Sequence, residues 1–198
     1  MRQRKPTRQR RTIHAPVSIR RILIKRVRVE TDRSYEDVLQ TMRQLIGVFQ
    51  QPTHRAENID PQPNAVVNEA ARHAAIAAFE RQTRAQLGKS DFMLFKELNH
   101  GAWLPVFGIR RRITRWIIGN PLIAITLMHH DLSAGLHVPV QLSVMEKESG
   151  SGSIIYYDVP SSIAGARAVE VAKAAKVLDQ KLRELVVLIS GVLLDDHP

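Results

Sequence analysis

The alternation of apolar and polar residues divides the chain into strand-like and helix-like stretches. Alternating apolar positions predict strands at residues 22–30, 92–98, 112–118, 138–144 and 154–158. Apolar residues three and four positions apart predict helices from Ser34 to near Pro52, from Val66 to Gly88 and from about Ser162 onward. This order of strand, helix, inserted helix, four strands and helix is typical of an α+β fold with a largely antiparallel sheet.

Three local signals support these elements. Ser34 and Asp37 have the spacing of a capping box at the start of the first helix. Gly150-Ser151-Gly152 joins the last two strands as a hairpin. The apolar positions of the last helix run from Ala168 to Val192, and a stripe of that length has to be buried against the rest of the fold.

The length of 198 residues predicts one compact domain with extensions. Residues 1–19 combine many arginines with two prolines, so we expect a disordered basic tail. Residues 20–198 are expected to form a single α+β domain, in which residues 50–90 are an inserted loop and helix.

The net charge of +10 is concentrated at the N-terminus. Residues 1–33 hold twelve Lys and Arg against two acids, whereas residues 34–198 hold seventeen bases and seventeen acids. The tail could therefore attract nucleic acid or another anionic surface, or serve as an organelle transit peptide. The bases that would act in such attraction are Arg2, Arg4, Lys5, Arg8, Arg10 and Arg11.

The absence of cysteine excludes disulfides, thiolate metal sites and cysteine nucleophiles. No stretch reaches the roughly 18 consecutive apolar residues of a transmembrane helix. We therefore expect a soluble cytoplasmic protein.

A recognisable set of residues lies between positions 117 and 160. It comprises Gly119-Asn120-Pro121, Leu127-Met128, Asp131, Gly135-Leu136, Val138-Pro139, Tyr157 and Pro160. In spacing this set resembles the domain of unknown function 302 family, and His100 also matches a histidine common there. The resemblance covers about residues 22–193 and implies a TATA-box-binding-protein-like β-α-β4-α fold. Ile118, His137 and Arg110-Arg111-Arg112 depart from the family pattern, so any role of the family's aspartate at position 137 is in doubt here.

The candidate ligand-binding residues are His100, Asn120, Met128, His129 and Tyr157. Imidazole and thioether groups can bind metals or haem iron, although structural histidines are the alternative reading. Asn120 could present its amide to a ligand, or Gly119 and Asn120 could serve a turn that needs positive φ. Tyr156 and Tyr157 should point to opposite faces of one strand. The sequence identifies no metal site and leaves any cofactor unknown.

A second basic stretch combines Arg110, Arg111, Arg112 and Arg115 with Trp103 and Trp116. These residues could stack on bases or hold an anion, or they could protect an exposed strand edge. Glu146 and Glu148 are expected at a hairpin tip in water, where they would remain ionised rather than act in acid–base catalysis.

Because these residues form no recognisable catalytic arrangement, the sequence favours a non-enzymatic module, and enzymatic activity stays uncertain. We expect a homodimer that binds a small, partly apolar ligand in a groove between the sheet and the C-terminal helix. Tail-mediated nucleic-acid binding and histidine-dependent metal, haem or enzymatic function are the alternatives.

Overall fold

The structure, a computed structural model, describes residues 17–19, 21–50, 69–164 and 169–194. The predicted tail therefore lies almost entirely outside the described residues. The strands are β1 (Arg26–Thr31), β2 (Gly47–Val48), β3 (Met93–Asn99), β4 (Ile113–Gly119), β5 (Val140–Glu146) and β6 (Ser153–Asp158). The helices are α1 (Tyr35–Leu45), α2 (Glu69–Gln86), α3 (Pro121–Met128), α4 (Pro160–Ala164) and α5 (Val169–Ser190), with 3₁₀ turns η1 (His100–Ala102), η2 (Leu104–Phe107) and η3 (Leu132–Leu136).

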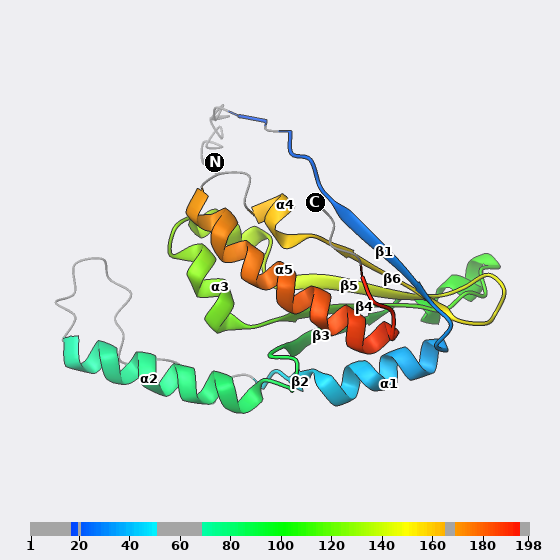
Figure 1. The fold of residues 1–198 in the computed structure, drawn as a ribbon, viewed down its shortest axis with the longest axis horizontal. Helices are drawn as coiled ribbons and strands as arrows, with labels where there is room; N and C mark the ends of the chain where they lie inside the picture. Colours follow the sequence, from blue (N-terminus) through cyan, green and yellow to red (C-terminus); the bar gives the residue numbers. More distant parts are fainter. Residues whose placement is uncertain (1–16, 20, 51–68, 165–168, 195–198) are drawn as a thin grey trace, which may run out of the picture.

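The six strands form one open sheet in the order β1-β6-β5-β4-β3-β2. All neighbouring pairs are antiparallel except β2 and β3, which are parallel. Helices α1 and α5 cover one face, and α3 packs beside α5 (Figure 1). On the other face Arg26, Arg28 and Gln141 are exposed to solvent. The α+β class and the largely antiparallel sheet are therefore as predicted.

The core lies between the covered face of the sheet and the apolar stripe of α5. Trp116, Leu142 and Ile155 point from the sheet toward the helices and are buried. The buried positions of α5 follow the predicted stripe and include Val171, Ala175, Leu178, Leu182, Leu185 and Ile189. Among the described residues, no helix is long and apolar enough to cross a bilayer.

The five predicted strands are confirmed with ends shifted by at most four residues. The first begins at Arg26 rather than at Ile22 because its partner β6 ends at Asp158, so residues 22–25 have no strand to pair with. The predicted capping signal of α1 is also confirmed: the Asp37 N–H donates to the Ser34 hydroxyl at 3.1 Å. That hydroxyl donates in turn to the Asp37 carboxylate at 2.7 Å.

The end of α1 differs from the prediction. The helix stops at Leu45 instead of continuing toward Pro52, because the chain turns into β2 and pairs with β3. The Gly47 N–H donates to the Phe92 carbonyl at 2.9 Å and the Phe49 N–H to the Leu94 carbonyl at 3.1 Å. The apolar residues beyond Leu45 therefore serve a strand rather than another helical turn.

Helix α3 was not predicted, and the expectation of positive φ before it was wrong. Asn120 has φ −137° and caps α3, whose Leu122 N–H donates to its side-chain oxygen at 2.9 Å. Gly119 has a different reason to be glycine: a Cβ there would lie 3.0 Å from the Pro139 side chain and 3.2 Å from the Phe95 ring. The Gly-Asn-Pro motif thus combines close packing with a helix cap.

Two glycines let the backbone cross itself where α1, β2 and α2 meet. A Cβ on Gly88 would lie 2.2 Å from the Leu45 carbonyl oxygen and 2.3 Å from the Gly47 nitrogen. A Cβ on Gly47 would lie 1.9 Å from the Gln86 carbonyl oxygen. Only hydrogen fits at either position, so this crossing fixes where helix α2 joins the sheet.

We expect Gly88→Ala to lower the free energy of unfolding by about 1–3 kcal/mol, because a methyl group there displaces backbone rather than a movable side chain. Urea unfolding would measure the loss. Gly135→Ala is the matched control, since its added Cβ makes only an ordinary 3.4 Å contact with Met128. Equal stability of the two variants would contradict this assignment.

Candidate functional site

A groove with a cavity volume of about 400 Å³ runs between the β1–β6 edge of the sheet and helix α5. Its apolar lining comes from Val27, Tyr157, Val159 and Leu194. Its polar lining comes from Lys25, Ser161, Ser162, Lys176, Asp179, Gln180 and Arg183. The groove therefore combines an apolar wall with three cationic side chains and one carboxylate.

Tyr157 reaches this groove because of the alternation along β6. It is paired with Val27 on β1 and Leu142 on β5, and all three are buried on the covered face of the sheet. Tyr156 lies on the opposite face, where its hydroxyl accepts a hydrogen bond from Arg28 Nε at 3.1 Å. The two tyrosines thus point to opposite faces, as the sequence predicts.

The groove keeps the Tyr157 hydroxyl protonated. Burial raises the pKa of Tyr157, and the nearby Asp179 carboxylate also raises it, while Arg183 acts in the opposite direction. A neutral phenol can donate a hydrogen bond to a ligand oxygen. Asp179 has a structural partner as well, because one of its oxygens accepts from the Ser161 N–H at 2.8 Å.

The segment just before β1 and the segment just after α5 both contribute to the groove. The Lys25 carbonyl accepts from the Val159 N–H at 2.8 Å, and the Lys25 N–H donates to Ser162 Oγ at 3.1 Å. On the other side, the chain folds back after α5 so that Arg183 donates to the Leu194 carbonyl. These bonds hold the walls of the groove against the sheet and the helix.

Asn120 and Met128 line a different and much smaller cavity, of about 80 Å³, beside α3 and Leu178 of α5. The Asn120 amide donates to the Asp91 carbonyl at 3.0 Å while its oxygen caps α3, so the side chain acts within the fold. The lining is mostly apolar and includes Phe95 and Pro139. A cavity of this size is well below the usual range for small-molecule sites, about 300–1,000 Å³.

The candidate histidines lie apart from the groove. His100 follows β3 at the end of the sheet opposite Asn120, and its ring meets Trp103 edge to face with centroids 6.1 Å apart. His129 and His130 are exposed, with ring centroids 5.7 Å apart. Across the described ranges, the structure contains no group of three His, Cys, Asp or Glu side chains placed to hold a metal ion. The sequence candidates are therefore spread over three places.

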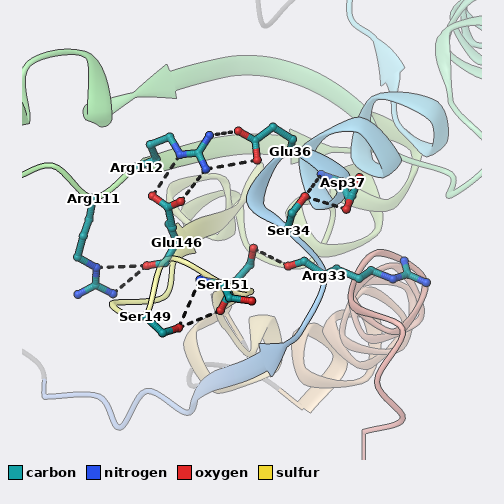
Figure 2. Close-up of polar contacts among 10 residues, drawn as sticks. Arg33, Ser34, Glu36, Asp37, Arg111, Arg112, Glu146, Ser149 and Ser151 are labelled. Atoms are coloured by element: carbon teal, nitrogen blue, oxygen red, sulfur yellow. Dashed lines mark hydrogen bonds and ion pairs between the residues drawn. The ribbon is translucent and has the colours of Figure 1, made fainter.

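The second basic stretch forms ion pairs within the fold (Figure 2). Arg112 connects β4 to Glu36 of α1 and to Glu146 of β5, at 2.6 Å from the nearer Glu146 oxygen. Its guanidinium also lies 4.8 Å from the centroid of the Tyr35 ring. Arg111 binds the Glu146 backbone carbonyl and pairs with Glu148 at 2.8 Å.

Three expectations for this region were wrong. Strand β4 lies between β3 and β5, so Arg115 on this strand does not guard a sheet edge. Trp116 is buried in the core, which leaves only Trp103 exposed and excludes a two-tryptophan stacking surface. Glu146 belongs to β5 and is ion-paired, rather than free in water at the hairpin tip.

The apolar stripe that predicts the last helix does not mark its groove residues, Lys176, Asp179 and Arg183. They recur at three- and four-residue spacing and lie along one side of α5. A polar stripe with this period indicates that the three side chains share one side of the helix. It indicates a binding site only when the element that faces this side is known. That element is β6, which the sequence places apart from the helix.

The comparisons with known proteins agree with this architecture. Residues 68–189 match the family model described as "Domain of unknown function DUF302". A solved structure, "Crystal structure of uncharacterized conserved protein DUF302 from Bacillus stearothermophilus", is similar with a TM-score of 0.54 and 11% sequence identity. The match covers 83% of this chain and 97% of that one. No curated protein matches the chain.

The Arg112–Glu146 pair predicts an acid-sensitive stability. Hydrogen bonding and charge from Arg112 hold the pKa of Glu146 below its usual value. The contribution of this carboxylate is therefore present above the ordinary pKa of about 4.3 and is lost as the pH falls through its lowered pKa. We expect Glu146→Gln to reduce the loss of unfolding free energy on acidification, measured by urea unfolding across this pH range.

Glu148→Gln is the control for that measurement because Glu148 is largely exposed and its pair with Arg111 lies in solvent. Its pH profile should follow that of the wild type. Parallel profiles for all three proteins would show that the Arg112–Glu146 pair does not set the acid sensitivity.

Proposed function

This chain belongs to the family described as "Domain of unknown function DUF302", and because that description names no activity, we propose a function from the groove beside Tyr157. The chain is a non-enzymatic module that binds a small, partly apolar molecule carrying an acidic group. It also associates with a second copy of itself. By the family resemblance, its architecture is the TATA-box-binding-protein-like β-α-β4-α arrangement, with β2, α2, α3 and α4 in addition. This statement concerns architecture alone.

The observation that carries the ligand proposal is the composition of the groove. Its volume of about 400 Å³ falls in the range of small-molecule sites, and both apolar and polar groups line it. An apolar chain would lie against Val27 and Tyr157, while its acidic group would lie near Lys176 and Arg183. Among the described lining residues, three cations face a single carboxylate, which favours an anionic ligand.

A binding role is favoured over a catalytic one by what the groove offers. Among the described residues, its lining holds neither a histidine nor a pair of carboxylates, which are the usual acid–base groups. Tyr157 has a raised pKa and is a donor rather than a base.

Octanoate is a suitable probe because it joins an apolar chain to a carboxylate. We expect the full chain to bind octanoate more tightly than octanol in isothermal titration calorimetry, since only octanoate can pair with the cations. Lys176→Glu should weaken octanoate binding by about threefold to tenfold through loss of attraction and added repulsion.

Lys173→Glu is the matched control. It makes the same change of charge on the same helix, at an exposed position outside the groove lining. Binding of octanoate should remain near the wild-type level. Failure of the wild type to bind octanoate, or equal weakening by both substitutions, would contradict the groove proposal.

Self-association is favoured by a separate observation. Trp103, Val106, Phe107 and Ile109 form an apolar tip on the η1–η2 segment, and Val106 and Phe107 are 82% and 72% exposed. The rings of Trp103 and Phe107 meet edge to face with centroids 6.1 Å apart. Exposed apolar clusters of this kind commonly mark interaction surfaces. A second copy is the proposed occupant because residues 26–198, from β1 onward, hold twenty bases and nineteen acids, so two copies of the folded body do not repel strongly.

We expect the wild type to sediment as a dimer, and a Trp103→Ser/Phe107→Ser variant to sediment as a monomer. The measurement is analytical ultracentrifugation over a range of protein concentrations. Leu132→Ser/Leu136→Ser is the control, since it removes two apolar side chains of η3 that are more exposed than Trp103 and Phe107. A monomeric wild type would overturn the self-association proposal without bearing on the groove.

A further inference from the structure

The segment that leads into β1 exposes an unusual amount of apolar surface. We call residues 17–19 and 21–25 the arm. Val17, Ile19 and Leu23 are 85%, 90% and 84% exposed, and Ile22 and Ile24 are also exposed. The arm has no strand beside it, because β6 ends at Asp158 and the chain then turns into α4. Its apolar side chains are therefore presented outward from the edge of the sheet.

Bases are interspersed among these apolar side chains. The sequence of residues 17–25 is Val-Ser-Ile-Arg-Arg-Ile-Leu-Ile-Lys, and Arg26 and Arg28 lie just beyond it. Arg21 and Lys25 are exposed. The whole excess charge of the protein lies within residues 1–33, so the arm belongs to its most basic region. Exposed apolar groups and dense positive charge thus occur in the same short segment.

We propose that the arm docks on an anionic lipid surface. A bilayer surface accepts both kinds of side chain at once: isoleucine and leucine enter the boundary between headgroups and acyl chains, while the bases pair with lipid phosphates and carboxylates. The arm lies outside the core and the groove walls begin only at Lys25, so docking needs no unfolding of the domain. This inference does not depend on the ligand proposed for the groove.

Two other partners fit the arm less well. Nucleic acid would satisfy the bases by phosphate contacts but would leave Ile19 and Leu23 without an apolar partner. A second copy could cover the apolar groups, but antiparallel pairing centred on Leu23 would place Arg21 opposite Lys25 of the other copy. Like charges directly opposite each other destabilise such a pair.

The test separates apolar from electrostatic contributions in the full chain. Binding is measured by co-sedimentation with phosphatidylcholine vesicles, with and without phosphatidylserine as about a third of the lipid. We expect binding only to vesicles that contain phosphatidylserine. Ile19→Ser/Leu23→Ser keeps every base, and it should lower the partition coefficient by about tenfold or more because two apolar side chains no longer enter the lipid.

Two further variants complete the design. Arg21→Gln removes one charge while keeping the apolar groups, and it should weaken binding by roughly fivefold. Leu132→Ser/Leu136→Ser removes two apolar side chains of similar exposure far along the chain and should bind like the wild type. A control variant that loses binding as strongly as Ile19→Ser/Leu23→Ser would contradict a role specific to the arm.

Three results would overturn the proposal. The first is a wild type that does not bind phosphatidylserine vesicles. The second is unchanged vesicle binding by Ile19→Ser/Leu23→Ser together with salt-sensitive retention of a DNA duplex, which would assign the arm to charge alone. The third is a dimer that dissociates on Ile19→Ser/Leu23→Ser, which would assign the arm to a second copy.

Discussion

The packing of α5 across the sheet is the interaction on which the rest of the structure depends. Each fully buried Leu or Ile of its stripe contributes about 1.5–3 kcal/mol relative to exposure, and Leu182, Leu185 and Ile189 are all buried against the strands. Because α5 lies along the sheet, one of its flanks meets α3 and the other meets the β1–β6 edge. The small cavity at Asn120 and the groove at Tyr157 are the spaces left on those two flanks.

The sequence predicts an element best where its local pattern of apolar residues matches the face that is packed in the structure. The Ser34 cap, the strand alternation of Val140 and Leu142, and the long stripe of α5 all follow from periodicities of two or 3.6 residues. Helix α3 escaped prediction because its residues are apolar on nearly every side, so no period marks it. Strand β2 escaped because two residues form a strand only when β3 is present beside them.

The candidate site could be predicted only in part, for a geometric reason. Tyr157, one of the candidates from the sequence, lines the groove, but the charged residues opposite it come from α5, more than a dozen residues further along the chain. His100 and Asn120 were grouped in the sequence although they lie at opposite ends of β3, and only the strand register separates them. The spacing of residues along a chain does not determine which ends of a sheet they reach.

The meeting of Lys25 and Leu194 at one groove has a mechanical consequence. Lys25 precedes β1 and Leu194 follows α5, yet both line the same cavity, and the backbone of each is bonded to a side chain there. Tension between the two ends of the domain would therefore act first across this cavity, before it reaches the core. A docked arm, or a rigid protein fused at either end, would transmit force directly to the residues that line the groove. Attachment at either end would therefore change the shape of the cavity through a few residues.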